Sequence, residues 1–306
     1  MVNTTEGTFN IDGASLYTKT WLPEGPLKAK MIIIHGFSDH VNRYKEFFQY
    51  LAERGIAVYG FDQRGWGRSV KEPSEQGKTG PTSRVLADMD AFIRSQLPSD
   101  VPVFVLGHSM GGGQALTLAS SPKYENLITQ IRGWILEAPF VGFAPELEPS
   151  WLLVTSGRMA ARFMPHFKLH KPIPPEDVTR DPEVQASIRV DPLMHNYGTL
   201  EGLASMLDRT NSLASGELKI SKNAKSLFMA HGTEDKATSF ARSKEWFGRN
   251  KSQIPDATFK AFEGFAHMLH ADPGKEEYFE DVASWILARS DVGKIDGDSG
   301  KASAHL

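Results

Sequence analysis

The sequence predicts one α/β unit: a mostly parallel sheet with helices on both faces and a helical segment inserted late in the chain. Short, continuous apolar runs such as Met31–Ile34 and Val103–Leu106 are typical of strands that are buried on both faces. Amphipathic stretches separate these runs, which is the pattern of parallel strands joined by helices. A chain of 306 residues, with 40% hydrophobic and 23% charged residues, is long enough and apolar enough to bury a large core.

The predicted strands and helices alternate along the chain. The first two strands are expected as antiparallel additions to the sheet, and the remaining strands as parallel. The strands are expected at Thr8–Ile11, Ser15–Trp21, Met31–Ile34, Ile56–Tyr59, Val103–Leu106, Trp134–Leu136, Leu227–Ala230 and Thr258–Phe262. Helices are expected around Tyr44–Leu51, Val85–Leu97, Gln114–Ala119, Phe240–Phe247 and Tyr278–Ile286, with Gly55 and Pro98 ending the first two.

The stretch from Phe140 to Leu218 departs from this alternation. It has no clear strand, and proline recurs through it. Because a structureless loop of that length is implausible in a compact domain, the stretch is expected to form a helical cap over the strand ends. We therefore predict a core in two parts (1–139 and 219–290), a cap (140–218) and a disordered tail (291–306). Most apolar residues of the cap are expected to pack on the core, and others to line a lipophilic tunnel or touch a membrane.

Composition excludes several classes of protein. The chain has no cysteine, so disulfides, thiolate metal sites and a cysteine nucleophile are ruled out. A formal net charge of -3 gives no reason to expect nucleic acid as a partner. The first residues lack the apolar core of a signal peptide, and no apolar run approaches a membrane span. A soluble cytoplasmic protein without metal or cofactor is the expectation.

The segment Gly107–Gly113 carries the strongest chemical signal. Its Gly-x-Ser-x-Gly pattern places Ser109 directly after a predicted strand and before a predicted helix. That context is the nucleophile elbow of the α/β-hydrolase fold, a sharp turn that needs small residues on both sides of the serine. His108 is interpreted as part of the elbow and not as a base.

A serine nucleophile needs a base and an acid that orients the base. In α/β-hydrolases the chain order is serine, acid, histidine. Asp235 and His267 follow the last two predicted strands and fill these positions. Two other acids remain candidates: Glu234, which is adjacent but should point away, and Glu137, which follows the strand Trp134–Leu136.

The oxyanion hole needs two backbone N–H groups that face the developing charge. One is expected from Met110, the residue after the nucleophile, and the other from Phe37, in the loop after the strand Met31–Ile34. His35, in the same loop, is expected to stabilise the turn.

The chain resembles the monoacylglycerol lipases, a family that includes lysophospholipase-like relatives. The resemblance covers roughly residues 6 to 290. It rests on His35–Tyr44, Phe61–Ser69, Gly107–Gly113, Asp191–Leu193, His231–Asp235 and His267–His270.

The resemblance implies a serine hydrolase that releases a fatty acid and glycerol from monoacylglycerol. It also implies polar contacts to the glycerol headgroup from Asp39, Arg43 and His270, the last of these also supporting His267. Ser187–Val190 stands where the animal branch carries a tyrosine near the headgroup, so the resemblance does not imply a headgroup contact from the cap. A carboxylesterase, lysophospholipase or thioesterase of the same fold is the alternative.

A lipid substrate implies transient contact with a membrane or lipid droplet, for which the segment Trp151–Val154 is the best candidate. The chain ends in Ala304-His305-Leu306, a loose relative of the peroxisomal Ser-Lys-Leu signal. Peroxisomal targeting is therefore the alternative to a cytoplasmic location. The oligomeric state is left open.

Overall fold

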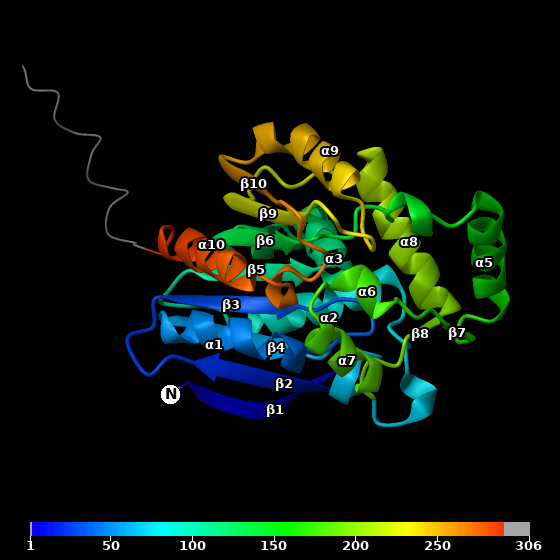
Figure 1. Ribbon diagram of the computed structural model, residues 1–306, viewed down its shortest axis with the longest axis horizontal. Helices are drawn as coiled ribbons and strands as arrows, with labels where there is room; N and C mark the ends of the chain where they lie inside the picture. The colour runs from blue at the N-terminus through cyan, green and yellow to red at the C-terminus, as the bar shows by residue number, and fades with distance from the viewer. Residues whose placement is uncertain (1, 291–306) are drawn as a thin grey trace, which may run out of the picture.

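A computed structural model describes residues 2–290, and within them an eight-stranded sheet forms the centre of the molecule (Figure 1). The spatial order of its strands is β1-β2-β4-β3-β5-β6-β9-β10. β1 pairs antiparallel with β2 and β2 antiparallel with β4, and all the other pairs are parallel. The strands are β1 (Asn3–Ile11), β2 (Ala14–Leu22), β3 (Ala29–Ile34), β4 (Ile56–Phe61), β5 (Val103–His108), β6 (Gly133–Glu137), β9 (Ser226–Gly232) and β10 (Asp256–Phe262).

Helices cover both faces of this sheet because side chains alternate across each strand. Val103 and Val105 of β5 belong to one buried cluster, and Phe104 and Leu106 to the other. The first cluster includes residues of α2, α3, α4, α8 and α9, and the second includes residues of α1 and α10. These helices are α1 (Lys45–Glu53), α2 (Thr82–Arg94), α3 (Met110–Ala119), α4 (Glu125–Ile128), α8 (Leu200–Ser215), α9 (Phe240–Asn250) and α10 (Lys275–Leu287). The predicted α/β fold with a mostly parallel sheet is confirmed.

The segment between β6 and β9 lies to one side of the sheet, where α5 forms the outermost part (Figure 1). It contains α5 (Trp151–Phe163), α6 (Pro175–Val178), α7 (Pro182–Val190) and α8. It also contains β7 (Lys168–His170) and β8 (Tyr197–Thr199), which pair antiparallel. The expectation of a strand-free segment is therefore wrong. A pair of three-residue strands between prolines is too short to produce a recognisable alternation of apolar residues.

The expectation that the apolar residues of this segment mostly pack on the core is wrong for α5. Within residues 151–163 no side chain is buried, and Trp151 and Phe163 are 77% and 81% exposed. The helix is amphipathic, but the chain itself does not cover its outer face.

In the part of the chain that the structure describes, no helix is long and apolar enough to cross a membrane. The predicted tail at 291–306, with its terminal Ala304-His305-Leu306, lies outside the described residues.

Candidate active site

Ser109 sits in a strained turn between β5 and α3. Its backbone adopts φ 53° and ψ −119°, a conformation that costs a residue other than glycine about 1–3 kcal/mol. Hydrogen bonds hold it there: its N–H donates to the Glu137 carbonyl at 2.9 Å, and its own carbonyl accepts from the Phe140 N–H at 2.8 Å. Packing thus presents a half-buried hydroxyl at the carboxyl end of the sheet.

The glycines of the elbow are required by space. A Cβ on Gly107 would lie 2.5 Å from the Gly111 carbonyl oxygen, and a Cβ on Gly111 would lie 2.1 Å from the Ile34 carbonyl oxygen. Both obstacles are backbone atoms, which cannot move aside as a side chain can. The sequence pattern Gly-x-Ser-x-Gly therefore follows from the close approach of α3 to β3 and β5.

The structure brings Asp235 and His267 together. Asp235 follows β9 and His267 follows β10, adjacent strands that end at the same edge of the sheet. His267 Nδ1 lies 2.8 Å from Asp235 Oδ2. The other carboxylate oxygen, Oδ1, accepts from the Ala237 and Thr238 N–H groups at 2.8 and 2.9 Å, which fixes the orientation of the carboxylate.

Burial and charge set the protonation of this pair. Burial alone would raise the pKa of Asp235, but the charge of His267 and the hydrogen bonds from His231 and His267 hold it far below its usual range. Burial alone would lower the pKa of His267, but the Asp235 carboxylate outweighs burial and raises it. The geometry therefore gives an ionised carboxylate that orients the imidazole and favours its protonation.

Within the described residues, Ser109 Oγ makes no hydrogen bond with His267. Such contacts are often long before substrate binds. His267 nevertheless lies close to the elbow, because the centre of its ring is 4.8 Å from that of His108, the residue before Ser109. His108 is buried, which lowers its pKa to about 3, so it is neutral at physiological pH. Its ring packs within the elbow as the sequence predicts.

Two backbone N–H groups are free to form the predicted oxyanion hole. Met110 is the first residue of α3, so its N–H has no acceptor within the helix. Among the described contacts the Phe37 N–H has no acceptor either. A Cβ on Gly36, next to Phe37, would lie 3.3 Å from the Cβ of Ser109, so this loop borders the elbow directly.

The remaining predicted residue of that loop is part of its structure. His35 is buried, and its Nε2 accepts the Gln63 N–H at 2.8 Å. Burial lowers the pKa of His35, which suits a neutral ring that accepts this bond.

The two rival acids have other surroundings. Glu234 is exposed. The fully buried Glu137 bonds His270 instead: its Oε1 lies 2.7 Å from His270 Nδ1 and accepts the His270 N–H at 3.0 Å. Of the three acids, Asp235 is the one whose carboxylate lies against His267.

The three residues predicted to contact the headgroup have protein partners in the structure. Asp39 is buried, and its carboxylate accepts from the Tyr44 hydroxyl and the His40 N–H. Arg43 donates to Ser187 Oγ at 3.0 Å. His270 is buried beside Glu137 and stacks on the ring of Tyr44. None of the three is among the residues that line the cavity at Ser109.

A mainly apolar cavity of about 490 Å³ opens at Ser109, a size within the range of small-molecule sites. Phe37 and Met110 border it at the elbow, and α5 and α8 contribute apolar side chains farther away. Among the lining residues are Phe140, Leu153, Val154, Leu203 and Leu207. The cavity therefore suits a long apolar group attached to a reacting carbonyl.

Sequence reasoning missed two partners of Asp235. His231 Nε2 lies 2.9 Å from Asp235 Oδ2, and Thr238 Oγ lies 2.9 Å from the same oxygen. The bond from the Ala237 N–H to Asp235, two residues before it, is that of an Asx turn, and an aspartate in such a turn was the available signal.

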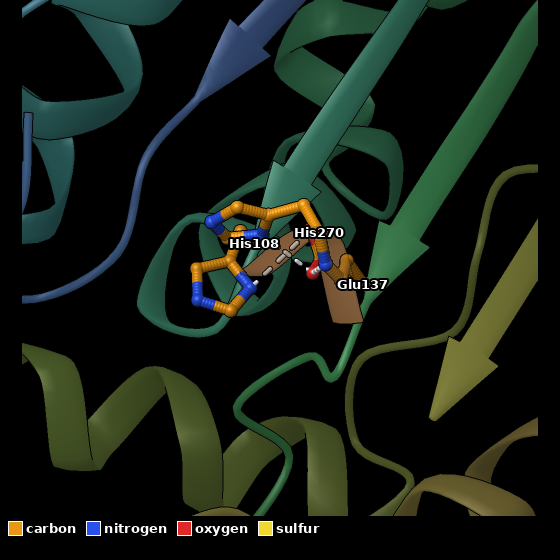
Figure 2. A group of neighbouring side chains, drawn as sticks. All are labelled: His108, Glu137 and His270. Carbon is orange, nitrogen blue, oxygen red and sulfur yellow. Dashed lines mark hydrogen bonds and ion pairs between the residues drawn. The ribbon is translucent and has the colours of Figure 1, made fainter. Parts of the chain in front are cut away.

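His108, Glu137 and His270 are residues of the types that ligate metals, and their ligand atoms lie within 4.8 Å of one another (Figure 2). Two ligands of a tetrahedral zinc ion are about 3.4 Å apart. The 2.7 Å between His270 Nδ1 and Glu137 Oε1 is instead the length of a hydrogen bond. His270 and Glu137 form a hydrogen-bonded pair, and His108 Nδ1 lies 3.6 Å from Glu137 Oε2.

Comparisons with known proteins agree with this geometry. The profile of the family described as Hydrolase_4, serine aminopeptidase S33, matches residues 25–274. A Schizosaccharomyces pombe protein, whose monoglyceride lipase activity is inferred, is 36% identical over 286 residues, covering 90% of this chain and 72% of that protein. The monoglyceride lipase of Mus musculus is 26% identical over 291 residues, covering 92% and 89%.

Solved structures show the same fold. A soluble variant of the Saccharomyces cerevisiae monoglyceride lipase, in complex with a substrate analog, superposes with a TM-score of 0.81 at 22% identity, covering 94% of this chain and 97% of that one. The monoacylglycerol lipase of Paleococcus ferrophilus superposes with a TM-score of 0.75 at 23% identity, covering 90% and 99%.

Proposed function

The chain belongs to the Hydrolase_4 family of serine hydrolases and, within it, to the monoglyceride lipases, and from this premise we propose that it hydrolyses monoacylglycerol to a free fatty acid and glycerol. The observation that carries the proposal is the position of Ser109: a serine with strained backbone geometry that lines an apolar cavity. The relatives named above support the choice of ester.

We assign the chemistry to three side chains and two backbone groups. His267, oriented by Asp235, removes the proton of Ser109 as its hydroxyl attacks the ester carbonyl. The N–H groups of Phe37 and Met110 stabilise the oxyanion. Glycerol leaves with a proton from His267. Water, activated by the same histidine, then releases the fatty acid from the acyl-enzyme.

The proposal is tested by incubating the purified full chain with a long-chain monoacylglycerol and measuring glycerol and fatty acid. Ser109→Ala should abolish release of both while leaving the circular dichroism spectrum unchanged. Ser284→Ala, on the exposed face of α10, is the matched control and should keep full activity. Activity retained in Ser109→Ala would contradict the assignment.

A panel of esters separates this function from its alternatives. Monoacylglycerol, diacylglycerol, lysophospholipid, an acyl thioester and p-nitrophenyl esters of rising chain length are compared by kcat/KM. The apolar cavity predicts a preference for long acyl chains. A maximum at acetate would indicate a short-chain carboxylesterase, and a maximum on lysophospholipid or thioester would replace the proposed substrate.

We also propose that the outer face of α5 touches the lipid surface that holds the substrate. This face exposes large apolar side chains, including Trp151, Leu152 and Phe163. Other residues of the same helix line the cavity. Replacing Trp151 and Phe163 together by Glu should abolish co-sedimentation with phosphatidylcholine vesicles. Val190→Glu, at a similarly exposed position on α7, is the matched control and should leave it intact.

For location, contact with lipid droplets or membranes is the proposal, and peroxisomal targeting through Ala304-His305-Leu306 is its alternative. A fluorescent protein fused to the N-terminus, with and without the last three residues, separates them. Peroxisomal puncta that disappear on truncation would favour the alternative.

A further inference from the structure

Glu137 is a buried carboxylate that the proposed reaction does not use. It ends β6, and its side chain is 0% exposed. Oε1 accepts two hydrogen bonds from His270, and Oε2 accepts one from the Tyr278 hydroxyl at 3.3 Å. Figure 2 shows the Glu137 side chain next to those of His108 and His270. A buried acid with this many donors is held in one position.

Glu137 connects the two parts of the site that must meet during reaction. Its carbonyl accepts the N–H of Ser109 at 2.9 Å, so its backbone supports the nucleophile. Its side chain bonds His270, which lies in the short turn η7 (Leu269–Ala271) directly after His267. One residue therefore spans from the elbow to the histidine loop.

Glu137 is also charged. Burial alone would raise its pKa, but His270 and His108 outweigh burial and lower the pKa to about 2. The resulting anion favours a positive charge on His267, as does the anion at Asp39. Titratable groups face or influence His267 from every surrounding element, namely Asp39 after β3, His108 on β5, Glu137 on β6, His231 and Asp235 at the end of β9, and His270 on η7.

We propose that Glu137 is a positioning residue of the active site, which holds the His267 loop against the Ser109 elbow through His270 and stabilises the imidazolium formed in acyl transfer. This inference rests on the proposed serine hydrolase function. A misplaced catalytic group costs up to about 100-fold in rate. The expected cost therefore falls on kcat and not on substrate binding.

Three variants of the full chain test the proposal with a soluble p-nitrophenyl ester. Glu137→Gln keeps the shape of the side chain and removes its charge. His270→Gln leaves the Glu137 carboxyl group in place and removes the ring contact. Glu234→Gln removes an exposed carboxylate one residue from Asp235 and is the matched control. For each, kcat, KM and the pH profile of kcat/KM are measured.

Glu137→Gln should lower kcat about 10- to 100-fold with KM within about 2-fold, because positioning and not binding is lost. Its acid limb should move to lower pH, because a neighbouring anion that favours protonated His267 is gone. His270→Gln should lower kcat about 10-fold with KM within about 2-fold. Glu234→Gln should match the wild type.

A role confined to folding would lower the Tm and leave kcat per folded molecule and the acid limb at wild-type values, which would overturn the proposal. If Glu137→Gln does not fold, His270→Gln is the test, and a wild-type kcat in His270→Gln would also contradict the proposal. Ser109→Ala separates this inference from the proposed function. If Ser109→Ala is active, the serine hydrolase function itself is contradicted. If Ser109→Ala is inactive but Glu137→Gln has wild-type kcat and pH profile, only the positioning role of Glu137 is contradicted.

Discussion

Replacing Asp235 by Asn should inactivate the protein through the tautomer of one histidine. Asp235 Oδ1 accepts the Ala237 and Thr238 N–H groups, so the carbonyl oxygen of an Asn must occupy that position. Its NH₂ group is then forced into the position of Oδ2, 2.8 Å from His267 Nδ1. Two donors cannot face each other, so Nδ1 must become the acceptor and the ring proton must move to Nε2.

The magnitude follows from that reversal. With a proton on Nε2, His267 cannot accept the proton of Ser109, and the loss in kcat for this change in a serine hydrolase is about 10⁴-fold, or about 5 kcal/mol of barrier. KM should change little, because Asp235 does not line the cavity. The fold should survive, because the two backbone bonds to Oδ1 are kept.

The assay is kcat and KM on a p-nitrophenyl ester, together with the rate of labelling by a fluorophosphonate and the Tm. Glu137→Gln, whose carboxylate bonds His270 and not His267, is the comparison and should lose no more than about 100-fold. Near-normal kcat in Asp235→Asn, with a 10⁴-fold loss in Glu137→Gln, would refute the reasoning and transfer the acid role to Glu137.

Three further predictions follow from the elbow and the buried carboxylate. The free energy of unfolding of Ser109→Gly should exceed that of Ser109→Ala by about 1 kcal/mol in denaturant titrations, because only glycine adopts φ 53° without strain. Equal free energies of unfolding would show that the turn is unstrained. Gly111→Ala should cost about 3 kcal/mol or more, because its Cβ would meet the Ile34 carbonyl oxygen at 2.1 Å, whereas Gly248→Ala, with open space around it, should be neutral or stabilising in thermal melts. The lowered pKa of Glu137, about 2 against an ordinary 4.5, should give about 3 kcal/mol of stability that is present above pH 4.5 and lost as the pH falls toward 2; urea unfolding at several pH values checks this, and an equally steep loss in Glu137→Gln would contradict it.

Much of the fold could be predicted because its signals are local. The run Val103–Leu106 is apolar at every position, which indicates a strand covered on both faces, and β5 is buried throughout. The paired strands β7 and β8 gave no such signal, because three residues are too few for a period to show. The apolar pattern of α5 predicted the helix correctly but not its exposure, since hydrophobicity does not say what covers a face.

The sequence by itself determined the elbow. Backbone atoms a few ångströms from Gly107 and Gly111 leave no room for a Cβ, so the glycine pattern around Ser109 indicates the turn directly. Only the tertiary structure decided which carboxylate meets His267. Glu137 ends β6 and Asp235 follows β9 at the same edge of the sheet, so chain order leaves both in reach. The hydrogen-bond partners of the two carboxylates distinguish them: Asp235 bonds His267, whereas Glu137 bonds His270. Such a choice depends on contacts between residues 32 and 133 positions apart, which no local pattern encodes.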